Sequence, residues 1–165
     1  VPDARQVAEM LVAAQPTMLV SVPRLYEKVF LTAHQKVADS PAKRAVFTWA
    51  LRVGGRNQRA YRKGRQPAAL WRAQLRLADK LVFAAVREAM GGPKTVLACG
   101  GAPLRQEIEE FFSACGLLVL QGYGLTETSP LVSFPSPVNF KFGTVGRVMP
   151  GGEGKLTSGD VSVSP

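Results

Sequence analysis

The chain has 165 residues and a formal net charge of +9, with 21 Lys and Arg against 12 Asp and Glu. This length fits one ordinary domain with a core of its own. No apolar run approaches the ~20 residues that span a bilayer, and a single histidine excludes a His-based triad or a multi-histidine metal site built from this chain alone. Cys99 and Cys115 fit a reducing compartment and are expected as buried free thiols.

The N-terminal part predicts a helix, a strand and a second helix. Apolar residues recur at helical spacing over residues 3–15, where Asp3 is a suitable N-cap and Pro16 ends the pattern. Residues 17–22 predict a buried strand, and residues 24–38 predict the next helix.

Two long helices follow. Ser40 or Asp39 can cap a helix over residues 41–61, which Gly54-Gly55 is expected to weaken or kink. A further helix is predicted over residues 68–90. Its buried stripe is expected to comprise Trp71, Leu75, Ala78, Val82, Ala85 and Ala89.

The excess positive charge is concentrated in this helical region. Between Lys43 and Lys80 there are 11 basic residues and one acidic residue, Asp79. A solvated helical face with acidic counterparts elsewhere in a larger enzyme is one interpretation. A patch apposed to anionic lipid, stabilised by ~1 kcal/mol per basic residue, is another. Nucleic acid is not expected as a partner, because no aromatic-rich strand or nucleic-acid module accompanies the charge.

The C-terminal half predicts two further strands around a helix. A strand over 95–99 precedes a helix that Pro103 opens and Gly116 ends, and the apolar run 117–120 predicts a buried parallel strand. The buried face of that helix is expected to comprise Leu104, Ile108, Phe111, Phe112 and Cys115. Residues 161–163 alternate like an edge strand. The element order predicts an α/β fold with a mainly parallel sheet flanked by helices.

The turn after residues 117–120 carries the residues most suited to chemistry. It reads Gln121-Gly122-Tyr123-Gly124-Leu125-Thr126-Glu127-Thr128. Open α/β sheets bind ligands at the carboxyl ends of their strands. The glycines let the backbone approach a ligand, and Tyr123 offers a flat face to a base. Thr126 offers a hydroxyl to a phosphate, and Glu127 offers a hard oxygen to Mg²⁺. The turn therefore suggests a magnesium nucleotide; a core aromatic at Tyr123 and a cap at Thr126 beside a solvated Glu127 are the alternatives.

Four motifs in order resemble those of the adenylate-forming, AMP-binding acyl-CoA synthetase superfamily, and within it the long-chain fatty-acid–CoA ligases. They are Pro16 to Lys28, Gly100-Gly101-Ala102-Pro103-Leu104, Tyr123-Gly124-Leu125-Thr126-Glu127-Thr128, and Phe142 to Arg147 followed by Pro150-Gly151. The similarity covers residues 1–152. Residues 41–90 resemble a long helix pair that one branch of long-chain ligases inserts at this point.

The resemblance implies that residues 1–165 are part of the large N-terminal adenylation domain, with 41–90 as a basic helical insertion. The chain would be an internal piece of a larger enzyme, lacking an upstream phosphate loop and a downstream catalytic lysine, and therefore inactive alone. The whole enzyme would be cytoplasmic, or peripheral to the inner face of the membrane.

The implied reaction activates a long-chain fatty acid with ATP to an acyl-adenylate and then transfers the acyl group to CoA. By position in the motif, Glu127 would bind Mg²⁺ and Thr126 would hold the α-phosphate, which makes both catalytic. Tyr123 would stack on adenine, with Gly124 in the same nucleotide-binding turn. Against the other side and edge of the base would lie Gly100, Gly101, Ala102 and Pro103.

Gln121 and Gly122 would lie where the acyl carboxylate meets the nucleotide, and Gly122 would leave room for the acyl chain. Two alternative functions remain open. One is an adenylating enzyme for another carboxylic acid, and the other is a non-catalytic basic α/β module that binds membranes or proteins.

Overall fold

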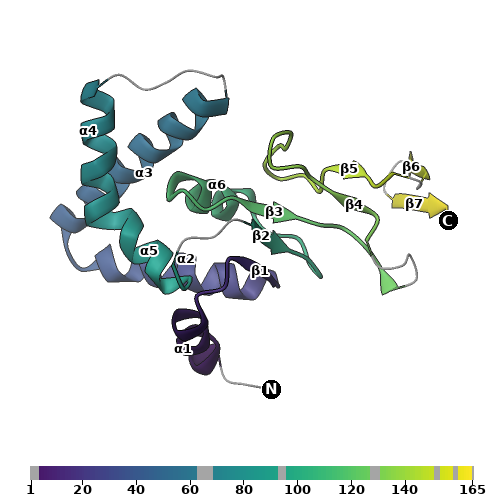
Figure 1. Cartoon of the computed structure of the whole chain (residues 1–165), viewed down its shortest axis with the longest axis horizontal. Helices are drawn as coiled ribbons and strands as arrows, with labels where there is room; N and C mark the ends of the chain where they lie inside the picture. Colours follow the sequence, from purple (N-terminus) through teal and green to yellow (C-terminus); the bar gives the residue numbers. More distant parts are fainter. Residues whose placement is uncertain are drawn as a thin grey trace.

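The computed structural model describes residues 4–62, 69–92, 96–126, 131–150, 153–157 and 160–164. A helix pair lies at one end of the long axis and a β-hairpin at the other, with a small sheet and further helices between them (Figure 1). None of the described helices is long and apolar enough to cross a membrane.

The sheet between these ends is parallel. Its strands are β1 (Met18–Ser21), β2 (Val96–Cys99) and β3 (Val119–Gln121). β2 is central, and its Leu97 lies opposite Leu19 of β1 and Val119 of β3. Parallel neighbours need long crossover connections, and helices supply both of them here. The predicted α/β class with a parallel sheet is confirmed.

The core lies where the sheet meets the helices α2 (Pro23–Ala38) and α6 (Gln106–Ala114). Phe111 of α6 packs edge-on against Phe30 and Phe112, with ring centroids 5.2 Å apart in both pairs. Such edge-to-face pairs add to the stabilisation from burial itself. The buried face predicted for this helix is confirmed, because all its members are buried: Leu104, Ile108, Phe111, Phe112 and Cys115.

The first strand differs from its prediction. Helix α1 (Ala4–Ala14) precedes it as expected, although Asp3, the predicted N-cap, lies outside the described residues. β1 is an edge strand, and its Met18 and Val20 side chains are 61% and 75% exposed. The prediction of a buried strand was therefore wrong. An apolar run does not reveal whether a strand is central or at an edge, since that depends on which strands pair with it.

The helix predicted to open at Pro103 begins later. Its first residue is Gln106, after an extended Arg105 with φ −65° and ψ 134°, and Pro103 is exposed outside the helix. The cause is the side chain of Gln121, which hydrogen-bonds both the N–H and the carbonyl of Leu104. Because these backbone groups already have partners, the segment before Gln106 stays extended.

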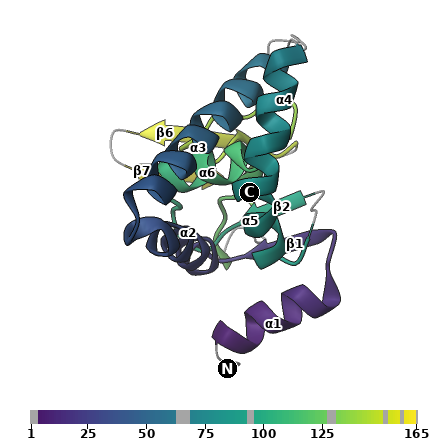
Figure 2. The ribbon, with the colours of Figure 1, turned by 90° about the vertical axis from the view of Figure 1, so that its left-hand side faces the viewer.

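The basic region folds as two helices in contact, α3 (Pro41–Arg62) and α4 (Ala69–Ala78) (Figure 2). Ser40 caps α3 as predicted, because its Oγ accepts a hydrogen bond from the Lys43 N–H at 3.4 Å. α3 is continuous through Gly54-Gly55, so these glycines do not interrupt the helix.

The helix predicted over 68–90 contains a π-helical turn. α4 passes into this turn, Asp79–Phe83, and then into α5 (Ala84–Ala89). A π-turn bonds residue i to i+5 and so adds one residue to a helical turn. Ala85 and Ala89, predicted as buried, are exposed, whereas Val86 and Met90, one position further along, are buried. The predicted stripe was wrong after Val82 because the pattern assumed uninterrupted α-helix.

Two short antiparallel pairs complete the chain. They are β4 (Ser133–Phe134) with β5 (Arg147–Val148), and β6 (Glu153–Thr157) with β7 (Asp160–Ser164). β7 contains the alternating segment at 161–163, so the strand predicted there is confirmed.

Candidate functional site

The carboxyl ends of the three parallel strands bring the motifs of the sequence together. The Gly100 N–H donates to the Ser21 carbonyl at 3.1 Å, and the Gly122 N–H donates to the Cys99 carbonyl at 2.8 Å. A Cβ placed on Gly100 would lie 3.8 Å from the Gly122 carbonyl oxygen. The glycine segment after β2 and the turn after β3 are therefore neighbours, as expected for a site at this edge of the sheet.

The glycine segment forms an open wall beside that turn. Gly100 is half-buried, whereas Gly101, Ala102 and Pro103 are exposed. Gly101 has φ +83°, a left-handed conformation that favours glycine. A planar ligand could approach this wall without displacing side chains from the core.

Tyr123 is held by its backbone and not by burial of its ring. Its N–H donates to the Ser133 carbonyl at 3.0 Å, and its carbonyl accepts from the N–H groups of Val132 at 2.8 Å and Ser133 at 3.0 Å. The side chain is only half-buried and lies outside the core cluster. The alternative of a plain core aromatic is therefore not supported, and part of the side chain remains accessible.

The space beside Gly122 is filled by other side chains. A Cβ at this position would lie 2.9 Å from Cδ2 of Phe134 and 3.2 Å from Cδ1 of Leu131. The expectation that Gly122 leaves room for an acyl chain was wrong for this conformation. The glycine lets Leu131 and Phe134, just before and in β4, pack closely on the turn.

A buried polar network, which the sequence did not predict, supports the turn from behind. Gln121 Oε1 accepts from the Leu104 N–H at 2.7 Å, and its Nε2 donates to the Leu104 carbonyl at 3.1 Å and to Glu109 Oε1 at 2.7 Å. Glu109 Oε2 accepts from the Gly143 N–H at 2.6 Å. Gln121 follows β3 at the predicted site, and its side chain is buried and turned towards α6.

Glu109 is 2% exposed, and burial raises the pKa of its carboxyl against the opposing effect of its two hydrogen bonds. The sequence contained a signal for this network. Glu109 is a charged residue that follows Ile108 and precedes Phe112 by three positions, on the side of the helix expected to face the core.

The phosphate and metal end of the turn is described only in part. Thr126 is exposed, while Glu127 and Thr128 lie outside the described residues. The described residues contain no group of three or more His, Cys, Asp or Glu side chains that could hold a metal ion. The roles predicted for Thr126 and Glu127 therefore stay predictions.

The two cysteines are buried free thiols, as predicted. Burial raises the pKa of both Cys99 and Cys115 to about 12. Because the thiolate is the nucleophilic form, neither residue is suited to nucleophilic chemistry at neutral pH.

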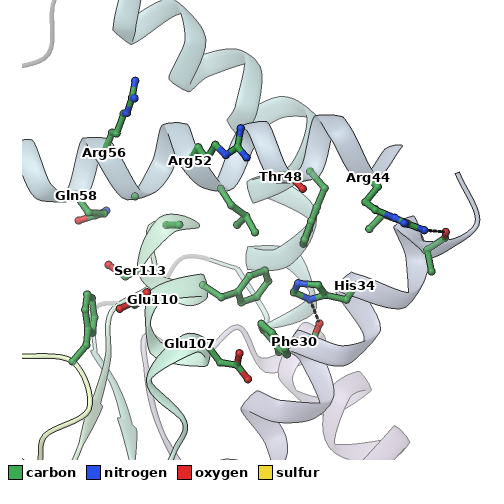
Figure 3. Close-up of a pocket in the computed structure, with 18 residues that line it drawn as sticks. Phe30, His34, Arg44, Thr48, Arg52, Arg56, Gln58, Glu107, Glu110 and Ser113 are labelled. Carbon is green, nitrogen blue, oxygen red and sulfur yellow. Dashed lines mark hydrogen bonds between the residues drawn. The ribbon is translucent and has the colours of Figure 1, made fainter. Parts of the chain in front are cut away.

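A separate cleft of about 900 Å³ opens between α2, α3 and α6 (Figure 3). Its lining includes Arg44 and Arg52 of α3 and Glu107 and Glu110 of α6. In its aromatic wall, His34 Nδ1 donates to the Phe30 carbonyl at 2.9 Å, and the His34 ring lies 5.0 Å from that of Phe47. His34 is thus a packing residue. Among the predicted site residues that the structure describes, none lines this cleft.

Comparison with known proteins agrees with these motifs. A family model described as "AMP-binding enzyme" matches residues 1–162. The chain belongs to the AMP-binding enzyme family. The long-chain-fatty-acid–CoA ligase FadD15 of Mycobacterium bovis is 38% identical to it over 149 residues, which are 90% of this chain and 24% of the relative. Long chain acyl-CoA synthetase 3 of Arabidopsis thaliana is 34% identical over 161 residues, 94% of this chain and 23% of the relative.

This AMP-binding chain therefore spans about a quarter of the length of the curated relatives it matches. Among solved structures, a benzoate CoA ligase from Burkholderia xenovorans LB400 covers 99% of this chain, with 24% identity and a TM-score of 0.52; the match covers 23% of that ligase. This likeness confirms the fold.

Proposed function

We propose that this chain is the nucleotide-binding part of a long-chain fatty-acid–CoA ligase. In the first step, a fatty carboxylate oxygen attacks the α-phosphorus of ATP, and the bond to diphosphate breaks. In the second step, the sulfur of CoA attacks the acyl carbon and AMP leaves with the electron pair of the broken C–O bond. The observation that carries the proposal is the convergence of the Gly100 segment and the Gly122 turn at one edge of the sheet. The names of the two ligase relatives described above favour the fatty acid as substrate.

The proposed roles follow the positions of the groups. The open wall from Gly100 to Pro103 and the accessible part of Tyr123 would enclose an adenine ring, because aromatic and flat backbone surfaces favour stacking. Thr126, exposed at the end of the turn, would donate its hydroxyl to the α-phosphate. Gln121 would act through the fold, since its side-chain amide already binds Leu104 and Glu109.

Mg²⁺ fits the donor available in this turn. Magnesium sites in nucleotide enzymes commonly use one or two carboxylates together with substrate phosphate oxygens, so a larger cluster of acidic residues is not required. Glu127 is the residue that would hold the ion. When bound, Mg²⁺ would neutralise charge on the phosphate oxygens.

The test uses the full-length protein that carries this chain. The wild type should form acyl-CoA from ATP, CoA and a long-chain fatty acid, and should catalyse fatty-acid-dependent diphosphate exchange into ATP. In Glu127→Ala, the rate of diphosphate exchange should fall about 100-fold or more, because the transition state loses several kcal/mol of stabilisation. The affinity for adenine nucleotide should fall much less. Glu110→Ala, an exposed glutamate on α6, is the matched control. Near-wild-type exchange in Glu127→Ala would remove that residue from the site, and absence of acyl-CoA from the wild type would refute the function.

We also propose that the protein is cytoplasmic and binds peripherally to the inner face of a membrane through α4 and the π-helical turn. Exposed leucines recur at intervals of seven and four residues: Leu70, Leu77 and Leu81 are 75%, 51% and 53% exposed. Exposed basic residues recur every four positions along the same segment: Arg72, Arg76 and Lys80. Apolar and basic stripes on one helix favour binding to an anionic lipid surface.

The acidic residue of this region does not offset that charge. Asp79 pairs with Arg87 at 2.7 Å, outside the basic run. Vesicles of phosphatidylcholine with phosphatidylserine should therefore co-sediment the protein at low salt and release it at high salt, because exposed charges are screened within ~8–10 Å at physiological ionic strength.

The variant R72Q/R76Q/K80Q should bind these vesicles more weakly than the wild type. The matched control R24Q/K28Q/K36Q removes three exposed charges from α2 and should bind like the wild type. Equal loss in both triple variants would mean that net charge alone drives binding, and no binding at low salt would refute the membrane proposal.

A further inference from the structure

Glu109 connects three segments that are far apart in sequence. It is central in α6, and its two carboxylate oxygens accept hydrogen bonds from different partners. Oε1 accepts from Gln121 Nε2 at 2.7 Å, at the end of β3, and Oε2 accepts from the Gly143 N–H at 2.6 Å. Each oxygen thus fixes one segment, and the rigid carboxylate fixes the separation between them.

The surroundings of Gln121 and Gly143 fix how each of them contacts Glu109. Gln121 Oε1 must face the Leu104 N–H, which is a donor, so its Nε2 must face the Leu104 carbonyl and Glu109. Gly143 has φ +71°, and a Cβ there would lie 2.9 Å from Gln106 Oε1. The loop at Gly143 therefore contacts the first turn of α6, and its left-handed backbone conformation favours glycine.

Burying the carboxylate of Glu109 costs folding free energy, which indicates that the side chain has a specific role. Its carboxylate is 2% exposed and forms no ion pair with any cation among the described residues. A buried carboxylate without a positive partner is unfavourable compared with an apolar residue of similar size. What it provides is a pair of acceptors that a neutral side chain cannot reproduce, because Gln has one acceptor and one donor group.

We propose that Glu109 is a positioning residue for nucleotide binding. It holds Gln121, and through it the Gly122–Thr126 turn and Leu104 behind the glycine wall, at a fixed distance from the loop around Gly143. This inference rests on the proposed function, since the turn and the wall are the surfaces assigned to the nucleotide there. Glu109 does not touch the ligand; it acts through Gln121 and Gly143.

The substitution Glu109→Gln tests the link directly in the full-length protein. The glutamine side chain has the same length as glutamate but only one acceptor oxygen. Its amide N–H group must therefore face either Gln121 Nε2 or the Gly143 N–H, which are both donors. We expect the Kd and KM for ATP to rise about tenfold or more, while the KM for CoA changes little. Hydrogen exchange of a peptide covering residues 140–146 or 117–122 should also become about tenfold faster. Glu110→Gln, an exposed neighbour on the same helix, should match the wild type in all these measurements.

A charge swap separates positioning from general damage. In E109Q/Q121E, the amide introduced at position 109 can donate to the carboxylate introduced at position 121, while the amide oxygen accepts from the Gly143 N–H. The swap therefore restores three of the four links. The double variant should have a lower Kd for ATP than Q121E alone, whereas simple addition of the two single effects would overturn the proposal. If E109Q does not fold, E109D serves, because its carboxylate is one methylene shorter and cannot reach both partners.

The outcomes distinguish this inference from the proposed function. A wild type that binds ATP but makes no acyl-CoA would refute the ligase and leave the role of Glu109 to be decided by ATP affinity and hydrogen exchange. An active wild type whose E109Q variant keeps its KM for ATP, with or without faster exchange, would refute positioning and leave the ligase intact.

Discussion

Two adjacent glycines in α3 give a sharp test of how this chain packs. A Cβ on Gly55 would meet nothing within 4 Å. A Cβ on Gly54 would overlap the carbonyl oxygen of Ala114 at the end of α6 and lie 2.9 Å from Cζ of Phe83. α3 and α6 therefore approach each other so closely that only a residue without a side chain fits between them.

The difference in unfolding free energy between the two alanine variants can be estimated because both positions lie in the same helix. Both lie inside one helix, so Gly→Ala gains the same ~1 kcal/mol of helix propensity at each. Gly55→Ala should therefore raise the free energy of unfolding by roughly 0.5–1 kcal/mol. At Gly54 the obstacle is a backbone carbonyl, which cannot rotate away, and overpacking costs about 3 kcal/mol at the upper end of its usual range. The propensity gain cancels in the comparison, so the two variants should differ by about 3 kcal/mol.

Thermal unfolding followed by circular dichroism measures this difference, with wild type and both variants made in the same protein. For a domain of this size, 1 kcal/mol corresponds to about 2–4 °C in Tm, so the two alanine variants should be separated by about 6–12 °C. The expected order is Gly55→Ala, wild type, Gly54→Ala. A Gly54→Ala protein as stable as Gly55→Ala would refute the close contact of α3 with α6.

Four further outcomes are expected. Tyr26→Phe should cost about 1–3 kcal/mol in urea unfolding, because it leaves the buried Ala98 carbonyl without the hydroxyl that donates to it at 2.9 Å. Cys99 and Cys115, each with a pKa of about 12, should not react with a thiol reagent at about pH 8 until the protein is unfolded. Burial raises the folded-state pKa of Glu109 above its ordinary value of 4.5, so its contribution to stability is present below that value and lost as the pH rises through the folded-state pKa. The urea midpoint of the wild type should accordingly fall relative to that of Glu109→Gln as the pH rises above 4.5. The 165-residue chain alone should form no acyl-CoA from ATP, CoA and fatty acid, and product above the blank would contradict this.

Much of the local structure could be predicted from the sequence. Pro41 after Ser40 marks the start of α3, Gly116 marks the end of α6, and the apolar run before Gln121 marks a parallel strand. These signals act within a few residues of their effect, so a single sequence contains them. The order of the glycine segment and the Tyr123 turn was likewise sufficient to indicate the family, because each motif is a continuous stretch of chain.

Tertiary structure decided what depends on atoms from distant segments. The π-turn shifted the buried stripe from Ala85 to Val86, and Phe134 filled the space beside Gly122. Gln121 turned towards α6 because Glu109 and Leu104, 12 and 17 residues away, offer it partners in the interior. A buried polar group must find its hydrogen bonds wherever the fold places them, and its own sequence neighbourhood does not reveal where that is.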